Sequence, residues 1–182
     1  MEFLIDLWAP ILVSAVLVWI ASFLCHMVIP LHKGEWRQLP SEEQTLQSLQ
    51  GATAGNYMFP WGTMADMKNP EFVERQKNGP NGTVIIWPGP VNMGRNLILT
   101  LLSYMLIGLF VAYIAWHALA GKPGSEYLEV FRIAGASAFL GHALGLIPHA
   151  IWYRGMRIWT VLVEGLIYAL LTAGTFAWLF PR

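Results

Sequence analysis

Charged residues are scarce in this chain of 182 residues, of which only 12% are Asp, Glu, Lys or Arg. Ordinary soluble domains carry roughly 25% charged residues, whereas 55% of this chain is hydrophobic. A chain of this length cannot bury so much apolar surface in one water-soluble core. The composition therefore predicts an integral membrane protein, with the lipid bilayer as its main partner.

The chain also lacks the short motifs of several enzyme classes. It contains no GxSxG, HExxH, CxxCH, GxGxxG or P-loop sequence, so the interpretation leans away from an enzyme and from a nucleotide partner. The net charge is zero, which provides no basic surface for nucleic acid. Cys25 is the single cysteine and lies in an apolar run, where a reactive thiolate is disfavoured.

Long apolar runs take the place of these motifs. A helix that crosses a bilayer needs about 20 mainly apolar residues. Four stretches meet this requirement, at about residues 8–31, 97–120, 133–151 and 158–180. We therefore predict an all-α membrane helical bundle, a single domain over residues 1–182, with four transmembrane helices and a long loop at residues 32–96.

Lysine and arginine near the helix ends predict the orientation of such a bundle. One side carries Lys33, Arg37, Arg95, Arg154 and Arg157. The other side carries Lys122, Arg132 and Arg182. Because positive residues favour the cytoplasmic side, we expect the long loop in the cytoplasm and both termini in the periplasm.

The long loop is expected to be partly helical. Ser41 and Gln44 have the spacing of a capping box, which predicts a short helix that ends near Gly51. A second short helix is predicted to begin at Asn69-Pro70, because proline is favoured at the first helical position. Residues 83–87 fit either a short strand or an interfacial segment.

Three stretches of the first half carry a resemblance to known sequences. They are residues 32–43, which read HKGEWRQLPSEE, residues 57–60, which read YMFP, and residues 67–72, which read MKNPEF. In these stretches the chain resembles small bacterial polytopic membrane proteins with no assigned activity. The resemblance implies a multi-pass protein of the bacterial inner membrane and implies no chemistry.

Ionisable side chains within the predicted spans are the main functional candidates, because such groups are costly in lipid. They are His26, His142 and Glu164. At 1.5 Å per residue, all three lie within roughly 7–14 Å of the inner boundary. Tyr104 reaches a similar depth, and Tyr168 is one turn beyond Glu164 on the same helix face. The five side chains are therefore predicted to form one polar site, which we name the predicted layer.

This layer has several interpretations that the sequence leaves open. Glu164 can serve a structural role by hydrogen-bonding to a histidine or tyrosine, or a His–Glu pair can relay protons. His26, His142 and Glu164 can ligate a divalent metal, and two histidines can hold a haem iron. No cofactor is assigned, and metal or haem stays an alternative. His32, His117 and His149 lie near tryptophans at the helix ends and are interpreted as interfacial anchors.

Small residues four positions apart in the third span predict close helix packing. Ser137, Gly141 and Gly145 form this stripe, which serves either packing within the chain or a contact with a homodimer or another membrane protein. The leading functional interpretation is a non-enzymatic accessory subunit or small transporter-like protein. The alternatives are a membrane redox or metal/haem-binding protein and a membrane enzyme with a site at the cytoplasmic boundary.

Overall fold

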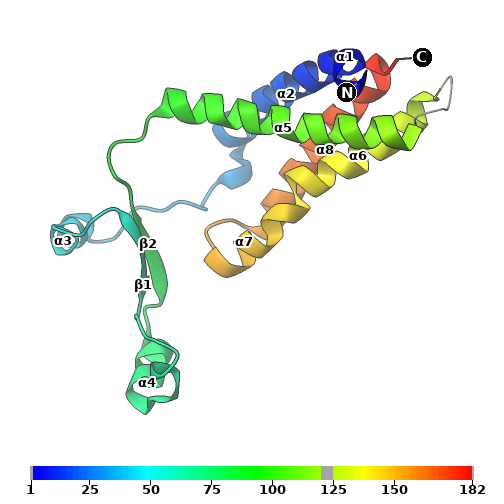
Figure 1. Cartoon of the computed structure of the whole chain (residues 1–182). Coiled ribbons are helices and arrows are strands. Elements are labelled where there is room, and N and C mark those ends of the chain that lie inside the picture. Colours follow the sequence, from blue (N-terminus) through cyan, green and yellow to red (C-terminus); the bar gives the residue numbers. More distant parts are fainter. Residues whose placement is uncertain (1, 120–124, 182) are drawn as a thin grey trace. The chain divides into compact units, whose positions relative to one another are not determined.

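The computed structural model describes residues 2–119 and 125–181, which form two compact units (Figure 1). The helical unit comprises residues 1–37 and 93–182, and the loop unit comprises residues 38–92. The helical unit contains α1 (Glu2–Asp6), α2 (Trp8–Phe23), a π turn (Leu24–Val28), a 3₁₀ turn (Pro30–His32), α5 (Met93–Leu119), α6 (Tyr127–His142), a 3₁₀ turn (Leu144–Leu146), α7 (Ile147–Tyr153) and α8 (Ile158–Leu179). The loop unit contains α3 (Glu42–Ser48), β1 (Gly55–Phe59), a 3₁₀ turn (Asp66–Lys68), α4 (Pro70–Asn78) and β2 (Gly82–Ile86).

Four long helices form a bundle in the helical unit. Helix α2 packs against α5 and α8, and α6 packs against the same two helices. The buried interior is rich in alanine, with Ala112, Ala134, Ala138, Ala169 and Ala173 all buried. Such small side chains let neighbouring backbones approach closely.

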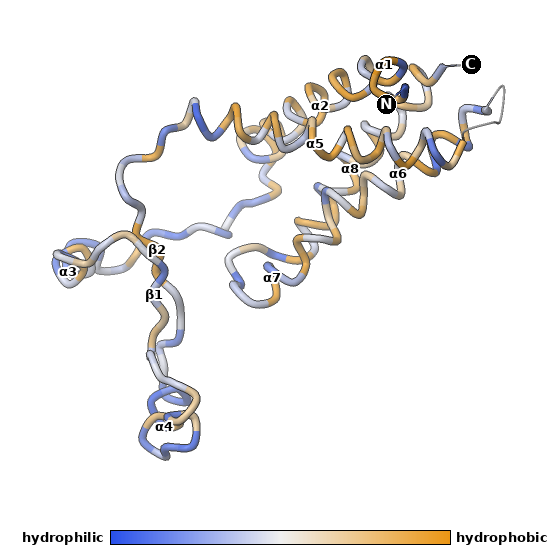
Figure 2. Tube along the Cα trace, in the orientation of Figure 1, coloured by the Kyte–Doolittle hydropathy of each residue, from blue (hydrophilic) through white to orange (hydrophobic). Residues whose placement is uncertain are grey.

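Many large apolar side chains lie on the outside of this bundle, although Phe176 and Leu7 are fully buried. On α5, Leu102, Leu106 and Phe110 are 51%, 54% and 61% exposed, and hydrophobic residues run along all four helices (Figure 2). Four helical segments are long and apolar enough to cross a membrane, Trp8–Val28, Met93–Leu119, Tyr127–Tyr153 and Ile158–Leu179. The predicted all-α architecture with four such helices is confirmed.

The third predicted span differs most from its predicted form. It begins at Tyr127 rather than near residue 133, and the 3₁₀ turn Leu144–Leu146 separates α6 from α7. Pro148 explains part of the break, because proline is tolerated in the first turn of a helix but not in its interior. Ala120, Lys122 and Arg182, which the sequence-based topology used, lie outside the described residues.

The first span ends in an irregular segment that turns the chain back. After the π turn Leu24–Val28, Ile29 is extended with φ −84° and ψ 131°, as expected for a residue before proline. Pro30 begins a 3₁₀ turn that ends at His32. Gly34 follows with φ +84°, a conformation that glycine adopts without steric penalty.

The loop unit is folded and partly helical, in agreement with the sequence. Strands β1 and β2 pair antiparallel, with Tyr57 opposite Val84, so residues 83–87 contribute to a strand. The Asn69 side chain accepts a hydrogen bond from the Glu71 N–H at 3.0 Å and caps α4. Ser41 precedes α3, but its side chain forms no cap hydrogen bond, so the predicted capping box is not formed.

Candidate metal centre

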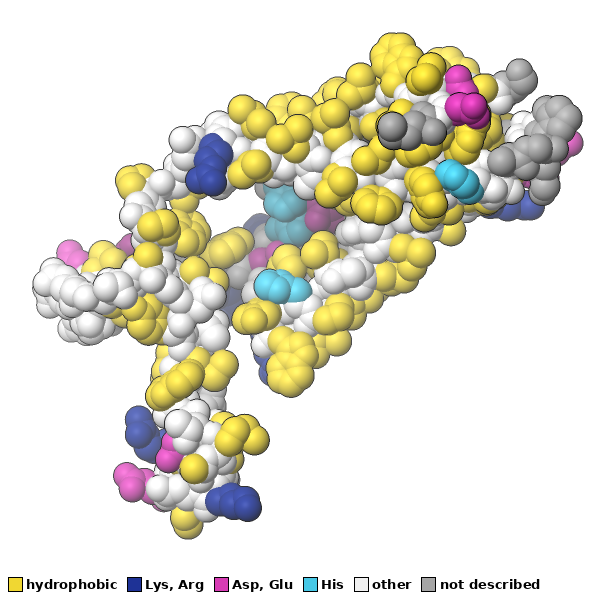
Figure 3. Space-filling model, in the orientation of Figure 1, with side chains coloured by type: hydrophobic (Ala, Val, Ile, Leu, Met, Phe, Trp, Pro, Cys, Tyr) yellow, Lys and Arg dark blue, Asp and Glu magenta, His cyan; other side chains and the backbone are white. Residues whose placement is uncertain are grey.

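Two imidazoles and one carboxylate converge at one end of the helical bundle. His26 comes from the π turn after α2, His32 from the 3₁₀ turn that follows it, and Glu164 from α8. Each offers one ligand atom, and these three atoms lie within 4.8 Å of one another. Histidine and acidic side chains lie side by side within this otherwise hydrophobic unit (Figure 3).

The two histidine rings are stacked and both face the Glu164 carboxylate. Their ring centroids are 4.2 Å apart with an interplanar angle of 16°. His26 Nδ1 lies 3.1 Å from Glu164 Oε1, and His32 Nε2 lies 3.5 Å from Glu164 Oε2. His26 Nδ1 also lies 3.0 Å from the Ser22 carbonyl oxygen, so a protonated Nδ1 donates towards both oxygens.

A second carboxylate holds His32 from the other side. Glu35 Oε2 lies 2.9 Å from His32 Nδ1, and the Glu35 side chain is only 4% exposed. Because a carboxylate oxygen can only accept a hydrogen bond, this contact favours the tautomer with the hydrogen on Nδ1, and Nε2 is then directed at Glu164. His32 Nε2 is buried and has no hydrogen-bond partner among the described residues.

Glu35 is in turn positioned by the first turn of α8. Its Oε1 accepts hydrogen bonds from the Thr160 hydroxyl at 2.7 Å and from the Arg157 backbone N–H at 3.4 Å. Burial alone raises the pKa of Glu35, but the hydrogen bonds from Thr160, His32 and Arg157 outweigh it and hold the pKa below its ordinary value. The carboxylate at a helix N-terminus is also favoured by the helix dipole.

Glu164 shares one face of α8 with the residues above and below it. Thr160, Glu164 and Tyr168 are spaced four residues apart, which places them on the same face of a helix. The Tyr168 hydroxyl donates a short hydrogen bond to Glu164 Oε1. The Glu164 side chain is 14% exposed, so it is directed towards the bundle.

The remaining members of the predicted layer form an aromatic group beside this cluster. Ring centroids of Tyr104 and His142 are 5.6 Å apart, those of His142 and Tyr168 are 5.5 Å apart, and those of Tyr104 and Tyr168 are 5.8 Å apart. His142 is buried at 7% exposure. Tyr168 therefore connects the aromatic group to the carboxylate, and His142 lies outside the group of possible metal ligands.

Two residues of the cluster, His32 and Glu35, are not among the site residues that the sequence predicts. The sequence predicts an interfacial anchor at His32 and no role for Glu35. The available signals were the three-residue spacing between them and the turn-forming residues Pro30 and Gly34. Ring contacts place His117 beside Phe3 and Tyr113, and His149 beside Tyr153.

The predicted small-residue stripe is divided between two elements. A Cβ atom at Gly141 would lie 3.0 Å from Ile107 Cγ2 on α5, so this glycine already serves packing within the chain. Gly145 lies in the 3₁₀ turn after α6. The Ser137 hydroxyl donates to the Ile133 carbonyl oxygen at 2.8 Å.

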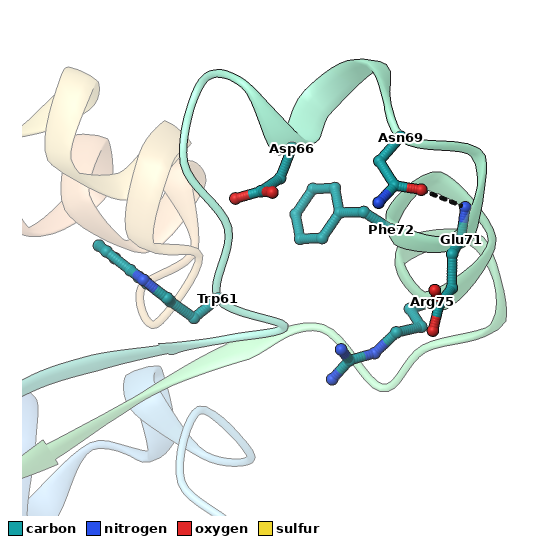
Figure 4. A pocket seen from close by; sticks show the side chains of 6 residues that line it. All are labelled: Trp61, Asp66, Asn69, Glu71, Phe72 and Arg75. Carbon is teal, nitrogen blue, oxygen red and sulfur yellow. Dashed lines mark hydrogen bonds between the residues drawn. The ribbon is translucent and has the colours of Figure 1, made fainter.

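A shallow pocket in the loop unit offers less chemistry. It is lined by Trp61, Asp66, Asn69, Glu71, Phe72 and Arg75 (Figure 4). The polar groups already have local roles, since Asp66 accepts two 2.7 Å hydrogen bonds from Thr63 and Asn69 caps α4. The bonds from Thr63 also lower the pKa of Asp66. Asp66 therefore stabilises a turn and Asn69 caps a helix, so neither side chain requires a ligand in the pocket.

No known protein family, curated protein or solved structure matches this chain. The resemblance to small bacterial membrane proteins therefore stays a prediction.

Proposed function

We propose that the chain is an integral protein of the bacterial inner membrane whose four apolar helices all cross the bilayer. Three observations support this. Helix α5 has 27 residues and is therefore about 40 Å long, enough to span a hydrocarbon core of about 30 Å. Its large apolar residues face outward. The lysine and arginine bias favours a cytoplasmic loop unit and periplasmic termini.

This topology is tested by cysteine accessibility in intact cells, in a Cys25→Ser background. A cysteine at Lys68 in the loop unit is expected to resist an impermeant thiol reagent until the membrane is permeabilised. A cysteine at Glu2, near the N-terminus, is expected to react in intact cells. The reverse labelling pattern contradicts the proposed orientation.

The function we propose is the binding of a divalent transition-metal ion, of the zinc class, by His26, His32 and Glu164. One observation carries this proposal, the buried Nε2 of His32, which has no hydrogen-bond partner in the described part of the chain and lies 3.5 Å from Glu164 Oε2. Histidines that ligate metals commonly donate their other N–H to a carboxylate. Glu35 occupies that position at His32 Nδ1.

Two distances in the cluster are close to those of tetrahedral coordination, although each involves a different oxygen of Glu164 and the three ligand atoms lie within 4.8 Å of one another. Bonds of 2.0–2.1 Å place neighbouring ligand atoms about 3.3 Å apart in a tetrahedral zinc site. The two histidine-to-carboxylate distances are 3.1 and 3.5 Å. To bind the ion through Nδ1, His26 would have to release the Nδ1 proton or rotate its ring away from the Ser22 carbonyl oxygen. The His26 side chain is 50% exposed, which leaves room for a ring rotation.

The same geometry favours a small ion over haem. Axial haem ligands approach the iron from opposite faces of the porphyrin, whereas the His26 and His32 rings are stacked side by side. Nitrogen and carboxylate ligands suit zinc or ferrous iron better than magnesium or calcium. Three protein ligands leave one tetrahedral position open, and the exposed His26 suits an ion that enters and leaves, as in a transporter-like protein or a metal-carrying subunit.

Zinc titration of the purified protein in detergent tests the proposal. We expect His32→Ala to abolish binding of one equivalent. Glu35→Gln should weaken affinity by about 10- to 100-fold, the usual effect of losing a carboxylate behind a ligating histidine. His117→Ala, near the far end of α5, is the matched control and should bind normally. Equal binding by all three variants contradicts the proposed ligands.

A proton relay is the second candidate, because Tyr168 donates to Glu164 and thereby continues the polar line beyond the cluster. A relay needs Glu164 to exchange a proton and needs no metal. Three results together would favour the relay over the metal site. The wild type would bind no zinc. Glu164→Gln would abolish proton flux across the membrane of reconstituted vesicles, and Tyr104→Phe would retain part of that flux.

A further inference from the structure

The two-stranded ribbon of the loop unit has two unlike faces. On one face, the Phe59 ring lies over Gly82, where a Cβ atom would approach Phe59 Cζ to 2.8 Å, and Tyr57 pairs with Val84. The other face carries Met58 from β1 and Ile85 from β2, which are diagonal neighbours in the register. Tyr57 and Phe59 on the first face are each 40% exposed, and the apolar side chains Met58 and Ile85 on the second face are more exposed, at 58% and 61%.

The second face carries exposed apolar residues. Met58 and Ile85 are 58% and 61% exposed, and Trp87, two residues after Ile85, is 60% exposed. We name these three residues the ribbon surface. Elsewhere in the loop unit, Trp61 and Met64 are 73% and 85% exposed. Phe72 is the one hydrophobic side chain of residues 38–92 that is buried, so the loop unit exposes far more apolar surface than it buries.

The connections of the loop unit indicate what covers this surface. Both ends continue into membrane-type helices, towards the span Trp8–Val28 on one side and into α5 at Met93 on the other. Trp87 is six residues before Met93 and so lies within about 20 Å of the start of that helix, even if the chain is fully extended. Tryptophan is also a preferred residue of the membrane–water interface.

The charge of the loop unit indicates the type of attraction. It contains five acidic residues, Glu42, Glu43, Asp66, Glu71 and Glu74, and three basic residues, Lys68, Arg75 and Lys77, for a net charge of −2. Attraction to anionic lipids requires clustered basic residues. The apolar side chains therefore have to provide the binding, and salt should have little effect on it.

We propose that the ribbon surface docks on the interfacial layer of the same bilayer that the helical unit spans. Met58, Ile85 and Trp87 insert among the lipid headgroups, and the acidic residues of α3 and α4 remain in water. The proposal rests on the proposed membrane insertion, so its test includes a separate readout of insertion.

The test uses the full chain in phosphatidylcholine vesicles, with an environment-sensitive fluorophore on single cysteines in a Cys25→Ser background. Labels at Met58→Cys and Ile85→Cys report on the ribbon surface. Glu74→Cys, on the polar helix α4, is the matched control within the same unit. Leu106→Cys, on the outer face of α5, reports on insertion of the bundle. Each sample is treated with lipid-attached and with water-soluble quenchers, at low and at high salt.

We expect the lipid-attached quencher to reduce the fluorescence at positions 58, 85 and 106 but not at position 74. The result should be the same at both salt concentrations. If position 106 is quenched by lipid while 58 and 85 respond only to the soluble quencher, docking is wrong and insertion stands. If neither quencher reaches 58 and 85, protein covers the ribbon surface and docking is also wrong. Absence of lipid quenching at 106 contradicts membrane insertion itself.

Discussion

The two ring nitrogens of His32 have different surroundings, and this difference gives the cluster its chemistry. Glu35 holds Nδ1 at 2.9 Å, while Nε2 faces Glu164 at the longer distance of 3.5 Å. Fixing the proton on Nδ1 leaves a lone pair on Nε2, which is what metal ligation requires. Glu35 is thus a positioning residue, and its protonation state decides whether His32 stays in this orientation.

The lowered pKa of Glu35 predicts a pH-dependent contribution to stability. The hydrogen bonds of the folded protein stabilise the ionised form of Glu35, which the unfolded chain does not. This contribution to the free energy of unfolding is present above the ordinary glutamate pKa. It is lost as the pH falls through the lower pKa of the folded protein. Thermal unfolding in detergent between pH 7 and pH 3 should therefore show a smaller acid-induced decrease for Glu35→Gln than for the wild type. If the melting temperatures of the wild type and of Glu35→Gln fall equally with pH, the lowered pKa of Glu35 is wrong.

Glu164 is expected to depend on its polar neighbours. A lipid-facing charge costs about 2.5–3.5 kcal/mol on insertion-based scales, whereas here Tyr168 and His26 contact the carboxylate. Glu164→Gln retains a hydrogen-bond acceptor for Tyr168, but Glu164→Leu leaves that hydroxyl unpaired and should destabilise the protein by about 1–3 kcal/mol. A Leu variant as stable as the Gln variant in thermal unfolding would show that these contacts contribute nothing.

At the scale of single elements, the sequence predicted helices well and irregular turns poorly. Apolar run length located all four long helices, and the four-residue spacing of Glu164 and Tyr168 correctly placed them on one face. The predicted depth of each side chain in the membrane assumes straight helices. It therefore does not include the π turn and the chain reversal at Pro30, which bring His32 back to His26. Depth also contains no information on rotation about the helix axis, so it could not indicate that His142 contacts the rings of Tyr104 and Tyr168 within the predicted layer.

The contact between α8 and the segment after α6 depends on Gly165. A Cβ atom there would overlap with the Ala143 Cβ and lie 3.0 Å from its Cα, so Gly165→Ala should destabilise the bundle by about 1–3 kcal/mol through overpacking. Gly174→Ala on the same helix is the control, since its nearest contact would be the Tyr127 hydroxyl at 3.8 Å. Removing that glycine should stabilise α8 by about 0.5–1 kcal/mol. Equal melting temperatures for the two variants would refute the close contact.

At the scale of the whole molecule, the helical unit is arranged for apolar surroundings. Alanines fill its interior, large apolar residues cover its exterior, and the polar groups concentrate where α2 ends and α8 begins. The composition predicted an integral membrane protein, but it did not indicate which apolar residues fill the interior and which face outward. The site could not be predicted in full, because it depends on a chain reversal and on contacts over more than 120 residues between Glu35 and α8.

X-ray absorption at the zinc edge of the zinc-loaded protein tests the central claim most directly. We predict a first shell of nitrogen and oxygen ligands at about 2.0–2.1 Å, with the outer-shell scattering of two imidazoles. Zinc that His26→Ala still binds should show one imidazole fewer, His32→Ala should bind no zinc at this site, and His117→Ala should give the spectrum of the wild type. A spectrum with no imidazole scattering, or one that changes only in the His117→Ala variant, contradicts the proposed metal centre.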